Sequence, residues 1–522
     1  MVRAAGILMP ITSLPSPYGI GTLGQTARDF IQFLEKSGQT YWQILPICPT
    51  GYGDSPYQSS STFAGNPYMI DLNDLVLEGL LQRADFEDFS WGDEPEKIDY
   101  KLQYEQRFVV LKKSVGNVST NMADSLSAFF QTEAYWLDDY ALYMAVKNHF
   151  GGTAWSQWPE PVRFRDTNKL AELKTTLAED ILFWKTIQFL FFHQWNKLKA
   201  YASQHHIQII GDLPIYVSED SADVWAHPEQ FQLNEELRPT EISGCPPDGF
   251  SEDGQLWGNP LFNWDYMKEN EFSWWITRIA HQMKIYDVLR IDHFRGFDSY
   301  FAIPYGDKTA KNGVWRKGPG IDFFQTVKEK LGDLPIIAED LGFLTDSVHQ
   351  LLKETGFPGM KVLEFAFDTR DTGYGYLPHC YTRNCIVYTG THDNETINGW
   401  FETAPEEDTA NAIRYLRLTK EEGYHWGMMR SAWASVSDTA IMQMQDLLGL
   451  GHEARINTPS TLSDNWTWRC KPEDISDELA KQLYEEMKIY ERLPQILKRK
   501  GVNAFTFTPS FSLNSKTHSY DS

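Results

Sequence analysis

The chain has 522 residues, of which 42% are hydrophobic and 23% charged, and its 47 basic and 71 acidic side chains give a formal net charge of −24. At about 100 to 200 residues per domain, this length predicts two to four domains or one heavily decorated barrel. The acidic balance argues against a nucleic-acid binder and against attraction to anionic membranes, because both partners are met by surplus Lys and Arg.

The cysteines and the apolar stretches bear on where the protein works. Five cysteines scattered over the chain are not the dense, even-numbered set of a disulfide-stapled secreted domain. Pro10 interrupts the apolar residues 1–9 and no small-residue cleavage site follows, so this segment predicts a strand rather than a signal peptide. Residues 181–192 include Lys185 and Gln188 and fall short of the ~20 apolar residues of a bilayer span. We therefore expect a cytoplasmic protein without a membrane segment.

Short apolar runs bounded by turn residues recur along the chain. They are continuous rather than alternating, as expected of strands buried on both faces of a parallel sheet, and helical-period stretches such as 27–37 separate several of them. In chain order the runs are residues 6–9, 41–45, 207–210, 288–291, 334–338, 361–365, 385–389 and 454–456. This α/β pattern predicts an eight-stranded (β/α)8 TIM barrel.

A plain barrel takes roughly 250 residues, so about half of this chain must be insertions between barrel strands. Residues 46–206, after the second run, open as a Gly/Ser/Pro/Tyr-rich loop and continue as charged, helix-like sequence. Residues 213–286, after the third run, carry a loop at 244–258 that we expect over the barrel mouth. No internal repeat or low-complexity linker marks an independent domain, which predicts one decorated barrel over residues 1–522. The Ser- and Thr-rich tail 509–522 is expected to be flexible.

Two patterns that mark cofactor or metal sites in other proteins are weak here. Residues 19–24 match the dinucleotide-binding pattern G-x-G-x-x-G, but three prolines separate them from the preceding strand and no acidic residue ends a second strand about 20 residues on. Cys380 and Cys385 lack a second Cys or His pair at the interval of a zinc site. The sequence therefore predicts neither a bound nucleotide nor a metal ion.

Acidic residues stand at or near the carboxyl ends of four predicted strands. They are Asp212, Asp292, Glu339 and Asp393. In a barrel these ends converge on one face, where catalytic groups lie. One such acid is more often a helix cap or a turn residue, but four together indicate an active site. The alternative is a set of buried acids paired with Arg290 and Arg295.

Asp292 and Glu339 end consecutive predicted strands, whose backbones lie about 4.8 Å apart. Their carboxyl groups are then expected ~5 to 5.5 Å apart, as in a retaining glycosidase, rather than the ~6.5 to 9.5 Å of an inverting enzyme. One carboxylate would attack the anomeric carbon, and the other, kept protonated by its neighbour's charge, would protonate the leaving oxygen. Arg290 lies on the same side of the strand as Asp292 and can hold that carboxylate ionised, as a nucleophile requires.

Further residues near the predicted mouth suit a sugar. His392 and Asp393 offer a neutral donor and a carboxylate that can grip hydroxyl groups as the sugar ring flattens. Aromatic rings present flat apolar faces with polar edges, which also suit sugars, although each ring singly is more readily explained by packing. The rings on the expected mouth loops are Tyr57, Phe250, Trp257 and Phe365.

Four segments of the sequence are specific as a set. They are Gly-Asp-Leu-Pro-Ile-Tyr-Val (211–217), Arg-Ile-Asp-His-Phe-Arg-Gly (290–296), Ala-Glu-Asp-Leu-Gly (338–342) and Gly-Thr-His-Asp-Asn (390–394). Together they resemble glycoside hydrolase family 77, the 4-α-glucanotransferases called amylomaltases. The likeness spans nearly the whole chain, and includes Ser-Pro-Tyr-Gln at 55–58, the Pro-Pro-Asp-Gly-Phe loop and Arg-Ile-Asn-Thr-Pro at 455–459.

The resemblance implies a role for each candidate residue. Asp292 would be the nucleophile, Glu339 the general acid/base and Asp393 the transition-state stabiliser. The sugar-binding residues around the cleaved bond would be Tyr57, Asp212, Arg290 and His392, with Phe250, Trp257 and Phe365 lining acceptor or neighbouring subsites. The implied reaction moves a segment of α-1,4-glucan onto the 4-hydroxyl of a glucose or maltooligosaccharide, without a cofactor and without the separate C-terminal β-domain of the amylases.

Three functions stay open at this point. A transferase must protect its glycosyl-enzyme until a sugar attacks, and large covering loops would serve that purpose. An α-amylase-like retaining hydrolase would use the same residues in a wetter site, and only the Pro-Pro-Asp-Gly-Phe loop and the family likeness favour transfer over it. A non-catalytic maltodextrin-binding protein would need no acid/base pair.

Overall fold

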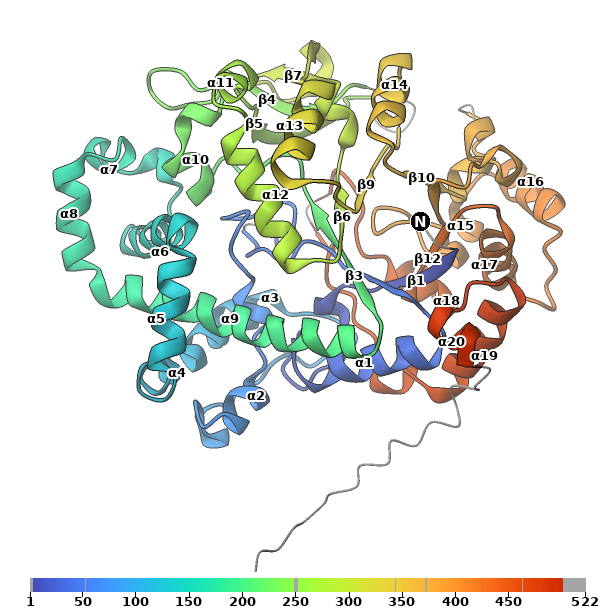
Figure 1. The fold of residues 1–522 in the computed structure, drawn as a ribbon, viewed down its shortest axis with the longest axis horizontal. Coiled ribbons are helices and arrows are strands. Elements are labelled where there is room, and N and C mark those ends of the chain that lie inside the picture. The colour runs from blue at the N-terminus through green and yellow to red at the C-terminus, as the bar shows by residue number, and fades with distance from the viewer. Residues whose placement is uncertain are drawn as a thin grey trace, which may run out of the picture.

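The centre of the molecule is an eight-stranded parallel sheet curved almost into a closed barrel (Figure 1). The computed structural model describes residues 3–51, 53–247, 252–342, 344–370, 373–461 and 463–500. In spatial order the barrel strands are β10 (Gly359–Val362), β11 (Cys385–Tyr388), β12 (Thr439–Gln443), β1 (Ala4–Leu8), β2 (Tyr41–Gln43), β3 (Gln208–Leu213), β6 (Val288–Ile291) and β9 (Ile336–Ala338). The two end strands meet where the Ala338 amide donates to the Pro358 carbonyl at 3.0 Å. The predicted (β/α)8 barrel is confirmed.

Alternating side chains of the strands divide between two hydrophobic cores. Ile7, Leu289 and Val387 belong to the large core that includes the surrounding helices. Their strand neighbours, among them Leu8 and Ile386, join a smaller cluster to which all eight barrel strands contribute. That cluster is the filled interior of the barrel, and burial on both faces explains why the strands read as continuous apolar runs.

Seven of the predicted runs overlap an observed strand, but the eighth prediction is wrong. Residue 454 ends a 3-10 turn (His452–Ala454), and residues 455 and 456 are not in a strand. The eighth strand is β12, which pairs with β11 and β1. It passes directly into the short helix α18 (Met444–Leu447), so no turn residue marks its end, and residues 439–448 read as one unbroken stretch.

The segment between β2 and β3 is largely helical, and its helices α5 to α8 lie at the left of Figure 1. The helices of this segment are α2 (Leu72–Leu77), α3 (Tyr100–Leu102), α4 (Phe108–Asn121), α5 (Ala123–Thr132), α6 (Ala134–His149), α7 (Glu160–Arg163), α8 (Thr167–Thr176) and α9 (Ala178–Gln204). Helix α9 brings the chain back to β3. In the described part of the chain, no helix combines the length and the apolarity needed to cross a membrane.

The segments after β3 and after β6 together build a second, antiparallel sheet at the top of Figure 1. Its strands, in spatial order, are β5 (Gln255–Pro260), β4 (Glu241–Cys245), β7 (Ser299–Pro304) and β8 (Val314–Lys317). Helices α10 (Ala222–Ala226), α11 (Trp264–Glu269) and α12 (Ser273–Ile285) lie in the same β3–β6 segment. Residues 248–251 of the predicted loop 244–258, and the tail 509–522, lie outside the described residues.

The remaining helices complete the outer layer of the barrel. They are α1 (Gln25–Lys36), α13 (Ile321–Leu331), α14 (Asp346–Thr355), α15 (Ile397–Thr403), α16 (Glu406–Leu416), α17 (Tyr424–Ala434), α19 (Asp477–Ile489) and α20 (Gln495–Lys500). Helix α1 packs against both α9 and α19, so residues far apart in sequence share one layer.

Strand β3 makes a close approach at Gly211, one residue before the acidic Asp212. A Cβ atom on Gly211 would lie 2.1 Å from the ring of Tyr286, which is buried at the end of α12. Real Cβ atoms do not come this near to a ring, so only glycine allows β3 and Tyr286 to pack as they do.

We expect Gly211→Ala to lower the stability of the fold by about 1 to 3 kcal/mol or more, because the added methyl overpacks a buried contact. The midpoint of urea-induced unfolding would measure the change. Gly116→Ala is the matched control, since Gly116 lies inside α4 with open space around it, and alanine there should stabilise by about 0.5 to 1 kcal/mol. A Gly211→Ala variant as stable as the parent chain would contradict the packing argument.

Candidate active site

The register of β3 and β6 places an acid directly opposite a base. Asp212 pairs across from Arg290, and both side chains are almost fully buried. The Nη1 nitrogen of Arg290 donates to both carboxylate oxygens of Asp212 at 2.7 Å and lies 3.1 Å from Oδ1 of Asp292. One guanidinium nitrogen therefore serves two carboxylates, including the one that the sequence pattern assigned to it.

Asp292 and Glu339 stand level at the carboxyl ends of adjacent strands, because Ile291 of β6 pairs with Ala338 of β9. The two oxygens of Glu339 accept hydrogen bonds from the backbone amides of His293 and Leu341, each at 2.7 Å. His293 adopts a left-handed conformation with φ 51°, which is uncommon for a residue other than glycine and is concentrated at functional sites. The backbone thus fixes the orientation of the Glu339 carboxyl group.

The pKa values of Asp292 and Glu339 are both raised, first of all by burial, and further by neighbouring carboxylates. Arg290 opposes this effect on both groups, and the two amides oppose it on Glu339. Acids this closely coupled bind protons as a pair. The direct contact with Arg290 favours the charge on Asp292, and the two amides favour the charge on Glu339.

Tyr57 and His392 join this group from two other loops. The Tyr57 hydroxyl donates to Oδ2 of Asp212 at 2.7 Å, and its ring stacks on the imidazole of His392 at 5.1 Å with an interplanar angle of 9°. Burial raises the pKa of Tyr57 and lowers that of His392, so both side chains are neutral. Tyr57, Asp212, Arg290 and His392 form one connected cluster.

Asp393 lies in the loop after β11, five residues beyond the end of the strand. Its Oδ2 is 3.4 Å from Nε2 of His392, and its Oδ1 accepts a hydrogen bond from Nδ2 of Asn457 at 2.6 Å. The side chain is 45% exposed, in contrast to the buried Asp212, so it can reach a bound molecule.

The aromatic candidates are spread around this cluster. Trp257 was expected on a loop but lies in strand β5, because residues 255–260 pair with β4. Its ring meets the imidazole of His293 edge-on at 4.8 Å, close to the amide that holds Glu339. Phe365 lies in a 3-10 turn (Glu364–Phe367) after β10 and packs against the barrel interior. Phe250 lies outside the described residues.

Several residues around Asp393 had no role in the sequence analysis. Arg455 belongs to the segment 454–456 that was mistaken for the eighth strand, Asn457 directly follows it, and Glu395 and Asp446 were not singled out. Arg455 donates from Nη2 to the backbone carbonyl of Asp393 at 2.9 Å and lies 3.1 Å from the Glu395 carboxylate. The Arg-Ile-Asn-Thr-Pro motif at 455–459 was the available signal, but its partners lie about 60 residues earlier in the chain.

Asp446 holds both ends of the loop that carries His392 and Asp393. Its Oδ2 accepts from the Thr389 hydroxyl and its Oδ1 from the Ile397 amide, each at 2.8 Å. The side chain is fully buried after β12, and burial raises the pKa of Asp446 to about 7.

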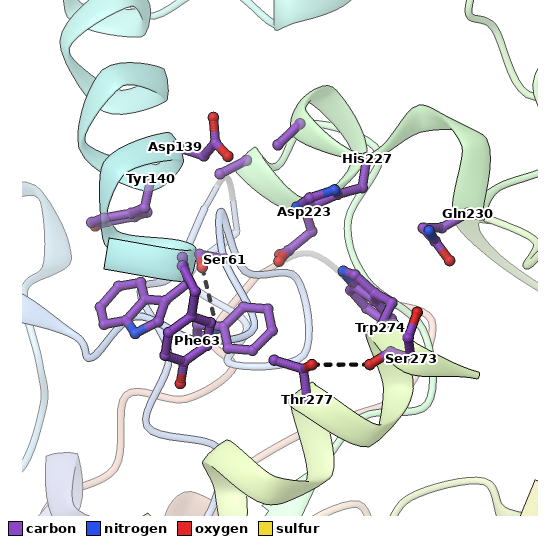
Figure 2. Close-up of a pocket in the computed structure, with 14 residues that line it drawn as sticks. Ser61, Phe63, Asp139, Tyr140, Asp223, His227, Gln230, Ser273, Trp274 and Thr277 are labelled. Carbon is purple, nitrogen blue, oxygen red and sulfur yellow. Dashed lines mark hydrogen bonds between the residues drawn. The ribbon is translucent and has the colours of Figure 1, made fainter. Parts of the chain in front are cut away.

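A cavity of about 260 Å³ lies elsewhere, between α6, α10 and α12 (Figure 2). None of the candidate residues lines it. Its two carboxylates already have protein partners, since Asp139 pairs with Arg165 at 2.6 Å and Asp223 accepts from the Thr62 amide at 2.8 Å. Among the described residues, no group of three or more His, Cys, Asp or Glu side chains could hold a metal ion.

Comparison with known proteins gives consistent matches. The family model of glycoside hydrolase family 77, described as 4-alpha-glucanotransferase, matches residues 9–475. A 4-alpha-glucanotransferase of Clostridium butyricum is 51% identical over 486 residues, which cover 93% of this chain and 100% of the relative. One from Thermus thermophilus is 47% identical over 502 residues, covering 94% and 99%. The solved structure of an amylomaltase from Streptococcus agalactiae in complex with acarbose is similar with a TM-score of 0.92 at 47% identity, covering 94% of this chain and 100% of that one.

We expect Asp446→Asn to stabilise the protein more at pH 8 than at pH 5. The pKa of Asp446 in the folded state, about 7, lies above the unfolded value of about 3.9. The folded state therefore binds the proton more tightly, and Asp446 opposes folding increasingly as the pH rises from about 4 to about 7. An asparagine can keep both hydrogen bonds, by accepting from the Ile397 amide and donating to the Thr389 hydroxyl.

The unfolding free energy of the variant and the parent at the two pH values checks this expectation. The gain should be on the order of 2 kcal/mol greater at pH 8 than at pH 5. Asp333→Asn, at a side chain that is 86% exposed, is the control and should show no such difference. A gain that is equal at both pH values would show that Asp446 does not titrate as its burial implies.

Proposed function

Because the chain belongs to glycoside hydrolase family 77, the 4-alpha-glucanotransferases, we propose that its transfer reaction is carried out by Asp292 as nucleophile, Glu339 as general acid/base and Asp393 as transition-state stabiliser. The activity is the movement of a segment of α-1,4-glucan to the 4-hydroxyl of an acceptor by a retaining double displacement. The observation that carries the assignment is the level placement of Asp292 and Glu339 at the ends of β6 and β9.

In the first step, Oδ of Asp292 attacks the anomeric carbon of the donor sugar while the glycosidic bond to the leaving oxygen breaks. Glu339 gives its proton to that oxygen, so the released part of the donor carries a free 4-hydroxyl. Arg290, 3.1 Å from Oδ1 of Asp292, favours the ionised nucleophile before the attack. The product of this step is a covalent glycosyl-enzyme.

In the second step, Glu339 is a carboxylate and takes the proton of the acceptor's 4-hydroxyl, whose oxygen attacks the anomeric carbon as Asp292 leaves. The two inversions give net retention. Asp393 and the neutral His392 would hold hydroxyl groups of the reacting sugar. These hydrogen bonds would strengthen as positive charge develops on the ring.

The surrounding residues are proposed to form the sugar subsites. Tyr57, Asp212, Arg290 and His392 would contact the sugar at the cleaved bond, and Trp257 and Phe365 would line acceptor or neighbouring subsites. The site of Phe250 is proposed from the family resemblance alone. We propose maltooligosaccharides and longer α-1,4-glucans as both donors and acceptors. Of the three functions that the sequence left open, membership in the family supports transfer over hydrolysis and over non-catalytic binding.

We expect the purified protein to convert maltotriose alone into glucose and a ladder of longer oligosaccharides, while the total of reducing ends stays constant. Glu339→Gln should lower the rate by about 10² to 10⁴, because general acid/base catalysis is lost. Asp292→Asn should lower it at least as much. Asp139→Asn, which changes a carboxylate of the separate cavity in Figure 2, is the control and should keep the parent rate.

Rescue by azide separates the two carboxylate roles. The donor is an α-maltosyl fluoride, because fluoride leaves without a proton from Glu339. With Glu339→Ala, azide would attack the glycosyl-enzyme and give an α-glycosyl azide, whereas with Asp292→Ala it would displace fluoride from the donor directly and give the β-anomer. The opposite pairing of anomers would overturn the assignment of nucleophile and acid/base.

In the maltotriose experiment, a rise in reducing ends without products longer than maltotriose would show hydrolysis instead of transfer.

A further inference from the structure

The position of Asp393 is not set by a barrel strand. Asp393 lies in the middle of the loop 389–397, between the end of β11 and the start of α15, and its side chain is 45% exposed. Asp446 secures only the two ends of this loop, at Thr389 and Ile397. Bonds within the loop, from Thr391 to Asn394 and from the Asp393 amide to the Thr391 hydroxyl, fold its middle but do not hold the Asp393 carboxylate. A group that stabilises a transition state has to be held within a fraction of an ångström.

The segment 455–457 contacts the middle of the loop from outside. Asn457 donates from Nδ2 to Oδ1 of Asp393 at 2.6 Å, and the backbone amide of Asn457 donates to the backbone carbonyl of His392 at 3.1 Å. Arg455 donates from Nη2 to the backbone carbonyl of Asp393 at 2.9 Å and from Nε to the Asn457 carbonyl at 2.9 Å. Arg455 therefore links the main chain of Asp393 to the residue that holds its carboxylate.

The guanidinium of Arg455 is itself held in place by Glu395. Its third donor, Nη1, lies 3.1 Å from Oε2 of Glu395, a nearly buried carboxylate two residues after Asp393. A planar guanidinium with donors in three directions suits this geometry, and an ammonium does not. His452 also contacts Glu395, at 2.8 Å through Nδ1, but its side chain is 65% exposed and it touches no part of the loop backbone in this contact.

We propose that Arg455 is a positioning residue for Asp393, acting through the main chain of Asp393 and through Asn457, with Glu395 as its anchor. The proposal rests on the function proposed above for Asp393 as transition-state stabiliser. The positive charge of Arg455 also acts on nearby acids. Asp446 and Glu395 raise the pKa of the buried Glu364 by repulsion, and Arg455 lowers it.

This role predicts a specific kinetic change. A displacement of about 1 Å at a group that acts in the transition state costs on the order of 10²-fold in rate. Such a loss appears in kcat more than in KM, because the interaction is stronger in the transition state than in the bound substrate. We expect Arg455→Ala to lower kcat for maltotriose disproportionation by about 10- to 100-fold, with KM within about 3-fold.

A double-mutant cycle with Asp393→Asn is the decisive test. If Arg455 acts through Asp393, adding Arg455→Ala to Asp393→Asn should change kcat by less than about 3-fold, because residues that act as a unit are not additive. Arg455→Lys should recover part of the activity, since it keeps the charge but not all three hydrogen bonds. Arg430→Ala removes another Arg–Glu pair, with Glu422, and should keep the parent kcat.

Several outcomes would overturn the proposal. They are an unchanged kcat in Arg455→Ala, a change confined to KM, or a full 10- to 100-fold loss in the Asp393→Asn background as well. If Arg455→Ala fails to fold, Glu395→Gln takes its place in the same cycle, because it removes the anchoring charge and keeps an acceptor. If Asp393→Asn itself keeps the parent kcat, the proposed function of Asp393 fails; if it loses activity but the cycle is additive, only the positioning role fails.

Discussion

The buried carboxylates at the barrel mouth depend on one guanidinium nitrogen, Nη1 of Arg290. Asp212, Asp292 and Glu339 would repel one another in a buried site, and removing a carboxylate from water is costly unless it is paired. Arg290 contacts Asp212 at 2.7 Å and Asp292 at 3.1 Å, in a place fixed by the pairing of β3 with β6. Among the residues that the structure describes, Glu339 is held instead by the backbone amides of His293 and Leu341. The site therefore depends on strand register, since a shift of one residue would turn Arg290 out of the barrel.

The site combines groups that are held in two physically different ways. Asp292 and Glu339 follow directly on barrel strands, so the hydrogen-bond ladder that builds the fold also places them. His392 and Asp393 lie in a loop, where no ladder operates, and side chains from another segment do the same work. A loop is easier to displace than a strand. The contacts of Arg455 and Asp446 therefore position this loop, as strand pairing positions Asp292 and Glu339.

The sequence predicted the parts of this site that depend on local patterns. Continuous apolar runs followed by an acid identified β3, β6 and β9, because burial on both faces and a polar strand end leave a readable signature. Strand β12 was not predicted because it passes into α18 without a turn residue between them. The link from Arg455 to Glu395 and Asp393 was not predicted for another reason. It joins segments about 60 residues apart, and nothing in either segment alone requires the other. Trp257 was expected on a loop, but β5 pairs with β4 as an antiparallel hairpin, in which Gln255 lies opposite Cys245.

In the proposed mechanism Glu339 releases a proton in one step and accepts one in the next, and its surroundings suit both tasks. Burial raises the pKa of Glu339, which favours the acid form, while the amides of His293 and Leu341 stabilise the carboxylate. A general acid/base works best when its pKa lies near the working pH, so these opposing effects are useful together. The amides of His293 and Leu341 do not titrate, and the oxygens of a carboxyl group can accept their hydrogen bonds as those of a carboxylate do. The carboxyl group can therefore change charge without changing orientation, which a partner such as lysine or histidine would not guarantee.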